Sequence, residues 1–146
     1  MAVIKNSVWI ERPVEEVFDY AVDMRNEREF NPDLQSIEKV TDGPVGVGTT
    51  YLAKWKQSQQ IEVRCTGYDR PREWVYVNGG PVSVTLHIKV EPERGGTRLV
   101  SRFDAHPNGW FVLVFPVFLM IMRRAEKGVG LNLKKALEGG AAASSA

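Results

Sequence analysis

The chain has 146 residues, 43% of them hydrophobic and 25% charged, which is the length and composition of one globular domain. Its 19 basic and 18 acidic side chains give a net charge of +1, which offers no indication of binding to nucleic acid. A single cysteine, Cys65, cannot form an internal disulfide, and together with the two histidines it offers no zinc-ligand spacing. We therefore expect a cytoplasmic protein without a metal or another cofactor.

A strand and two short helices are expected at the start of the chain. Residues 3–10 are rich in β-forming side chains and predict the strand. Pro13 suits the first position of a helix, and the residues after it have the spacing of one apolar helix face: Val14, Val17, Phe18 and Ala21. Asp23 can cap a second short helix, which ends before Asn31 and Pro32.

In the middle of the chain, apolar side chains recur every second residue, as in β-strands separated by turns. We expect six strands, at residues 34–40, 49–56, 60–68, 73–77, 82–90 and 97–105. The fourth is apolar on both faces, so the pattern leaves its orientation open. In the last hairpin, pairing Ile88 with Leu99 would align the apolar rows and leave Arg102, Asp104 and His106 on the opposite face.

A long amphipathic helix is expected at the C-terminal end of the chain, with Pro116 as its first residue. At about 100° per residue, one narrow stripe collects the apolar side chains Phe118, Met122, Ala125, Val129, Leu133 and Ala136. Gly128 and Gly130 each lower the stability of a helix by about 1 kcal/mol relative to Ala. We expect close packing, or a ligand that approaches the backbone, beside Gly128. Residues 1–138 are expected to form one domain, and residues 139–146 a disordered tail.

Several short motifs resemble one known family. They are residues 13–18 (PVEEVF), 30–32 (FNP), 41–49 (TDGPVGVGT) and 95–98 (GGTR). Together with the closing helix, they resemble the polyketide cyclase/dehydrase-like branch of the START/Bet v 1-like (SRPBCC) superfamily over essentially the whole chain. The resemblance implies an α+β helix-grip fold, in which a curved antiparallel β-sheet wraps around a long C-terminal α-helix and two short helices follow the first strand. It also implies an apolar cavity between the sheet and the long helix.

The function expected from this resemblance is binding of a hydrophobic small molecule, lipid or polyketide-like ligand in that cavity. Small side chains in the middle of the long helix predict a cavity of about 300 Å³ or more. We expect its ligand-binding residues to be Tyr51, Trp55, Val63, Val84, Leu86, Phe103, Phe118, Met122, Ala125, Val129 and Asn132. The fold alone does not choose among the ligands and reactions of such proteins.

Two alternatives stay open. In the first, the protein is a polyketide cyclase or dehydratase that applies acid–base chemistry to a ketone-bearing substrate, which requires a titratable group inside the cavity. The row Arg102, Asp104 and His106 is expected on the solvent face, so no catalytic residue is assigned. In the second, the protein is an interaction module that uses exposed apolar residues such as Met120 and Leu131.

The apolar run 110–122 is too short to cross a membrane, because a transmembrane helix takes about 20 residues. Basic residues at positions 123, 124 and 127 follow this run. The sequence therefore predicts no transmembrane segment and no nucleic-acid partner, and it leaves peripheral contact with a membrane and a homodimer open.

Overall fold

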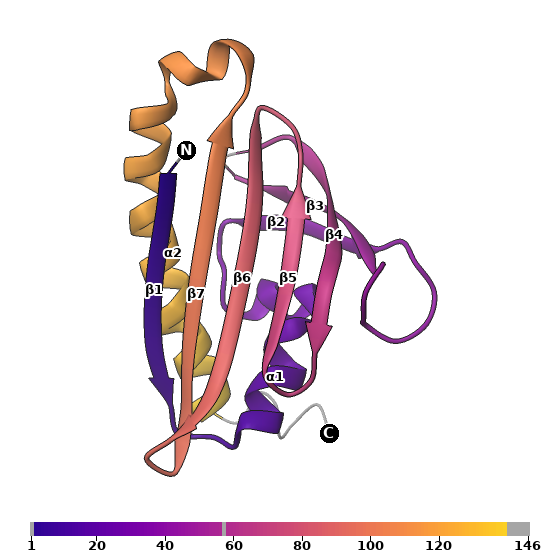
Figure 1. Ribbon diagram of the computed structural model, residues 1–146, viewed down its shortest axis with the longest axis vertical. Helices are drawn as coiled ribbons and strands as arrows, with labels where there is room; N and C mark the ends of the chain where they lie inside the picture. The colour runs from indigo at the N-terminus through magenta and orange to yellow at the C-terminus, as the bar shows by residue number, and fades with distance from the viewer. Residues whose placement is uncertain (1, 57, 140–146) are drawn as a thin grey trace.

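The computed structural model describes residues 2–56 and 58–139 and contains a seven-stranded antiparallel sheet (Figure 1). The strands have the order β1-β7-β6-β5-β4-β3-β2, so β1 and β2 lie at opposite edges of the sheet. The strands are β1 (Ala2–Ile10), β2 (Leu34–Lys39), β3 (Thr50–Trp55), β4 (Gln60–Asp69), β5 (Glu73–Asn78), β6 (Val82–Glu93) and β7 (Gly96–Pro107). The helices are α1 (Val14–Val22), η1 (Met24–Glu29), η2 (Gly109–Leu113) and α2 (Phe115–Glu138).

The sheet is curved, and the long helix α2 lies on its inner side. In Figure 1, α2 runs along β1 and β7, whereas β2 and β3 bend across the other part of the sheet. The helix packs against β1, and α1 and η1 follow that strand as the sequence predicts. The predicted α+β helix-grip fold is therefore confirmed. Of the predicted tail at 139–146, only Gly139 lies within the described residues, where it ends α2.

The two short helices begin within one residue of their predicted positions. Pro13 stands one residue outside α1, in the N-cap position, instead of inside the first turn. The second helix, η1, is a 3₁₀ helix, and its cap is Asp23, whose carboxylate accepts a hydrogen bond from the backbone N–H of Arg25 (3.0 Å). Only one apolar side chain of η1, Met24, is buried, so packing offers little support for a longer α-helix.

The register of the last hairpin differs from the prediction by two residues. Leu99 pairs with Val90 instead of Ile88, because the turn consists of Arg94 and Gly95 alone. Both turn residues have positive φ, 51° and 77°, as a tight two-residue hairpin requires, so the strands extend further toward the turn than expected. A shift of two residues keeps every side chain on its predicted face.

The structure resolves the orientation of β5, which the sequence pattern left open. Trp74 and Tyr76 point to the inner face and are buried, and Val75 and Val77 are only half-buried on the other face. The Trp74 ring packs edge-to-face against Phe18 of α1 (5.0 Å between ring centroids). Contact with α1 therefore decides which apolar row of β5 faces inward.

The buried side of α2 is rotated from the predicted stripe. Its buried residues are Phe115, Leu133 and Leu137, which are centred about 60° around the helix from the middle of that stripe. Of the six predicted positions only Leu133 is buried, and the others are half-buried. No helix within the described residues is long and apolar enough to span a membrane.

Candidate functional site

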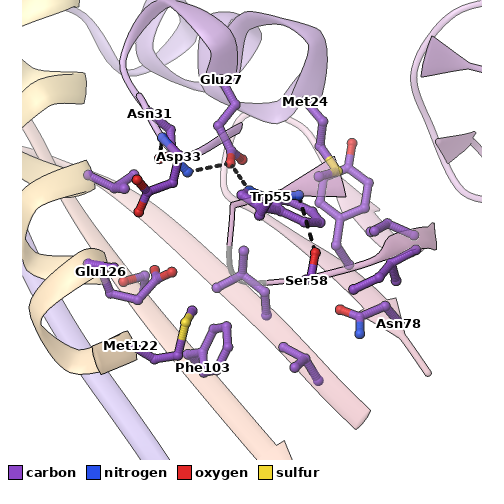
Figure 2. A pocket seen from close by; sticks show the side chains of 18 of the residues that line it. Met24, Glu27, Asn31, Asp33, Trp55, Ser58, Asn78, Phe103, Met122 and Glu126 are labelled. Atoms are coloured by element: carbon purple, nitrogen blue, oxygen red, sulfur yellow. Dashed lines mark hydrogen bonds between the residues drawn. The ribbon is translucent and has the colours of Figure 1, made fainter. Parts of the chain in front are cut away.

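A cavity of about 330 Å³ lies between the inner face of the sheet and α2, in agreement with the expected size (Figure 2). It is lined by side chains from two apolar clusters, one that contains Trp74 and Leu133 and another that contains Phe103. Part of its wall comes from η1 and from the segment after it, through Glu27 and Asn31. The cavity therefore draws on both ends of the chain and on the sheet between them.

Nine of the eleven predicted ligand-binding residues line this cavity. They are Trp55, Val63, Val84, Leu86, Phe103, Phe118, Met122, Ala125 and Val129. Several of them keep accessible area because they face open space, which explains why the predicted stripe of α2 is only half-buried. Whether a ligand contacts these residues stays a prediction.

The other two predicted residues, Tyr51 and Asn132, do not line the cavity. Tyr51 is fully buried (0% exposed) and packs edge-to-face on Tyr76, with 5.8 Å between the ring centroids. Its ring therefore fills the core under β3 and β4, as aromatic side chains in such rows commonly do. The rotation of α2 turns Asn132 away from the cavity.

The same rotation corrects the prediction for the helix glycines. Gly130 lines the cavity and Gly128 does not. A β-carbon added at either position would meet no atom within 4 Å, so close packing does not explain either glycine. At Gly130 the absent side chain leaves the backbone of α2 open to the cavity.

Among the described residues, three carboxyl groups line the cavity, and none of them was predicted from the sequence to lie there: Glu27, Asp33 and Glu126. In Figure 2, Glu126 reaches into the cavity from α2, and Glu27 and Asp33 enter it from η1 and the start of β2. No Lys, Arg or His is found among the described residues of the lining. The charge that this apolar site can carry is therefore only negative.

Glu27 is held in place by two donors. Its Oε2 atom accepts hydrogen bonds from Nε1 of Trp55 (2.8 Å) and from Nδ2 of Asn31 (2.8 Å). Burial raises the pKa of Glu27, and the two hydrogen bonds oppose that rise because they stabilise the carboxylate. Both bonds reach the same oxygen, so Oε1 of Glu27 has no hydrogen bond from the described residues.

Glu126 has a different environment. It is half-buried, and no hydrogen bond or ion pair joins its carboxyl group to any residue that the structure describes. Burial, together with the negative charge of Glu27, raises the pKa of Glu126 to about 7. Near neutral pH this carboxyl group is therefore divided between its protonated and ionised forms.

A family model described as “Polyketide cyclase / dehydrase and lipid transport” matches residues 1–143. The chain belongs to this family. The resemblance stated from the motifs is thus confirmed.

Solved structures share the fold at low sequence identity. Ara h 8.0201 matches with a TM-score of 0.69 and 19% identity, over 98% of this chain and 98% of its own. TTHA0849 from Thermus thermophilus matches with a TM-score of 0.71 and 16% identity, over 92% and 95% of the two chains. DynU16, from the dynemicin biosynthetic locus, matches with a TM-score of 0.69 and 13% identity, over 94% of this chain and 48% of DynU16. A comparison with curated proteins finds no match.

The row that looked most like a catalytic group in this family member lies outside the cavity. Arg102 pairs with Asp104 (3.0 Å) on the outer face of β7, and His106 is exposed. His87 lies on the same outer face, where its ring is 3.3 Å from a carboxylate oxygen of Glu73. The predicted position of this row, on the face opposite the apolar residues, is confirmed.

A sequence signal for Glu126 does exist. Glu126 follows Met122 by four residues and precedes Val129 by three, so a helix places all three on one side. At about 100° per residue, the predicted apolar stripe runs around the helix from Ala125 to Leu133, and Glu126 falls just beyond its edge at Leu133. No comparable signal marks Glu27, because its place depends on Trp55, 28 residues away in the chain.

Proposed function

We propose that this protein binds a hydrophobic small molecule, a lipid or a polyketide-like compound, in the cavity between the sheet and α2. The observation that carries the proposal is a cavity of about 330 Å³ whose wall is mostly apolar side chains. Small-molecule sites are typically of this kind, apolar with a few placed polar groups. Family membership supports the same class of ligand, since the family description includes lipid transport.

Native mass spectrometry of the protein purified from its source tests this proposal. A co-purifying apolar compound would support it and would identify the class of ligand. The proposal fails if the protein carries no bound compound and also does not enhance the emission of an apolar fluorescent probe.

A second candidate function is acid–base catalysis on a ketone-bearing substrate, as in a cyclase or dehydratase. One observation favours it: Glu126 supplies the titratable group that this function needs inside the cavity, with a pKa raised to about 7. The carboxylate of Glu126 would take a proton from the carbon beside the ketone, and the resulting carboxylic acid would return a proton to the enolate oxygen.

Deuterium exchange provides the test of this catalytic function. With 2-decanone in deuterated water, the protein should accelerate exchange at the carbons beside the carbonyl, and Glu126→Gln should abolish the acceleration. Exchange at the same rate with and without the protein would contradict an enolising role.

We also propose that an anionic membrane surface is the partner of the exposed apolar segment around η2. Trp110 (72% exposed) and Leu113 (84% exposed) lie in this segment, which continues into α2 with exposed Val117 and Ile121. Residues 105–125 contain no acidic side chain, and Arg123 and Arg124 are both exposed near its end. Apolar groups beside basic ones suit the boundary between lipid headgroups and acyl chains.

Vesicle sedimentation distinguishes the partners of this segment. Binding to phosphatidylglycerol vesicles, weakened by Leu113→Ser and by salt, would support contact with an anionic membrane. Equal or absent binding to phosphatidylglycerol and phosphatidylcholine vesicles would contradict it. Analytical ultracentrifugation that shows a dimer, lost on Met120→Ser or Leu131→Ser, would assign the exposed residues to a second copy.

The cytoplasmic location is likewise a proposal, which the single, unpaired and buried Cys65 supports.

A further inference from the structure

The ionisable groups of the cavity have one sign, and this feature bears on the kind of ligand that can enter. Glu27, Asp33 and Glu126 line the cavity, and the described lining contains no Lys, Arg or His. A site made for fatty acids or other anions would need at least one basic group or backbone donor for the negative end of the ligand. The charged groups of the described lining are instead all acceptors, beside neutral polar side chains such as Ser58, Gln59 and Asn78.

Two of these carboxyl groups have unused acceptor capacity that faces open space. Glu126 has no hydrogen bond from the described residues, and Oε1 of Glu27 has none, since both donors reach Oε2. The unpaired oxygen atoms of Glu126 and Glu27 are not fully buried, because the unpaired and fully buried side-chain atoms of the described residues belong to Asn6 and Asp104. Because both residues line the cavity, these oxygens can be reached by a molecule inside it.

We propose that the cavity selects an apolar ligand that carries a protonated amine, with the ammonium group held by Glu126 and Glu27 and the apolar body lying along the sheet. This inference rests on the proposed function, because it requires that the cavity binds a ligand. Asp33 adds negative charge at the same end of the cavity, and the ring of Trp55 lies beside Glu27.

Physical chemistry favours an ammonium group over the alternatives. An ammonium group has three donors and no acceptor, so it supplies what the two carboxyl groups lack. It also offsets the repulsion between Glu27 and Glu126, which contributes to the raised pKa of Glu126. The Trp55 ring could add a cation–π contact. A carboxylate ligand would place a further negative charge in the same apolar space, without a counter-charge on the described lining.

Three ligands of equal chain length separate this proposal from simple apolar binding: decylamine, decanol and decanoate. Their affinities are measured by displacement of an apolar fluorescent probe at about pH 8, where the amine is mainly cationic and decanoate anionic. We expect decylamine to bind about tenfold or more tightly than decanol, and decanoate to bind more weakly than decanol. Glu126→Gln should remove about tenfold of the affinity for decylamine and leave decanol unchanged.

A matched control and a measurement on the unaltered protein complete the experiment. Glu91→Gln makes the same chemical change on the exposed surface of β6, and it should leave all three affinities unchanged. In the wild-type protein near pH 7, binding of decylamine should release protons, because the ammonium group lowers the pKa of Glu126. Isothermal titration in buffers of different ionisation enthalpy measures this release.

The outcomes distinguish the two proposals. Equal affinity for decylamine and decanol, or tightest binding of decanoate, would overturn selection of an amine and leave the binding cavity in place. An unchanged preference for the amine in Glu126→Gln, without proton release in the wild type, would likewise overturn the role given to Glu126. If neither the probe nor any of the three ligands binds, the proposed binding function itself fails.

Discussion

Glu126 of α2 and Glu27 of η1 face the same cavity, and the negative charge of Glu27 contributes to the raised pKa of Glu126. The two residues are far apart in the sequence and on different elements, and among the described residues only Glu27 has hydrogen-bond donors for its carboxylate. Glu27 accepts hydrogen bonds from Trp55 and Asn31, whereas Glu126 has no partner among the described residues. This asymmetry makes Glu126 the side chain on which a ligand's polar group would act.

Glu126→Gln should make the protein more stable at neutral and alkaline pH. An ionisable Glu in the unfolded chain titrates near 4.5, and burial raises the pKa of Glu126 in the folded protein to about 7. Between these values the folded state binds more protons than the unfolded state, so the free energy of unfolding falls as pH rises. The free energy of unfolding of the wild type falls by up to about 3 kcal/mol in this way, and the Gln variant avoids this loss because its side chain does not titrate.

Urea unfolding of the wild type and of Glu126→Gln at pH values from about 4.5 to 8 measures this effect. The advantage of the variant should increase across this range. Glu91→Gln, which removes an exposed carboxylate, should not change the slope. Parallel stability curves for the wild type and Glu126→Gln would show that Glu126 titrates as an ordinary surface residue.

Val129→Trp should fill the cavity and abolish binding of an apolar fluorescent probe while the protein stays folded. Val129 lines the cavity from the middle of α2, so an indole ring there would occupy space that a ligand needs. Leu131→Trp places the same ring on the exposed side of the same helix and should leave probe binding unchanged. In a solid core the change at Val129 would instead cost about 1 to 3 kcal/mol by overpacking. Retained probe binding with a large fall in melting temperature would contradict the position assigned to Val129.

Trp55→Phe should destabilise the protein more at alkaline than at acidic pH. The substitution keeps an aromatic ring but removes the Nε1–H group that donates to Glu27 (2.8 Å). A hydrogen bond to an ionised group contributes about 1.5 to 3 kcal/mol, and its loss matters most when Glu27 is charged. Unfolding free energies at about pH 5 and pH 8 give the comparison.

Trp9→Phe provides the control for this experiment. Nε1 of Trp9 donates to the backbone oxygen of Glu93 (2.8 Å), which does not titrate. Its loss should therefore cost about the same at both pH values. A pH-independent effect of Trp55→Phe as well would show that Glu27 keeps one protonation state across this pH range and would contradict the prediction.

Gly128→Ala and Gly130→Ala should each stabilise the protein by about 1 kcal/mol, because both glycines are inside α2 and an added β-carbon meets no atom within 4 Å. Their effects on ligand binding should differ. Gly130 lines the cavity and Gly128 does not, so only Gly130→Ala should weaken binding of the probe. Thermal unfolding and probe titration of the two variants measure both effects. A loss of binding in Gly128→Ala alone would restore the original prediction that a ligand approaches Gly128.

The sequence by itself determined the local structure, because it depends on neighbours in the chain. The period of two along 82–90, Pro13 before α1 and the Asp23 cap of η1 all predicted elements that the structure contains. The assignment of Arg102 to the outer face was also correct, since the alternation of side chains survives a two-residue change of register. The predicted register of the last hairpin was wrong by two residues, because the register depends on the tight turn formed by Arg94 and Gly95.

Only the tertiary structure decided which polar groups face the cavity. The sequence pattern of a helix shows that one side is apolar. The packing of α2 against β1 decides which residues lie at the centre of the side that faces the sheet. In the structure this side is rotated from the predicted stripe, so Glu126 faces the cavity and Asn132 does not. Tyr51 lies on the same face of β3 as Trp55, but its ring packs against Tyr76 of β5 in the hydrophobic core instead of lining the cavity. Burial of a carboxyl group, and the pKa that follows from it, depends on what distant segments leave uncovered, and no spacing within one element contains that information.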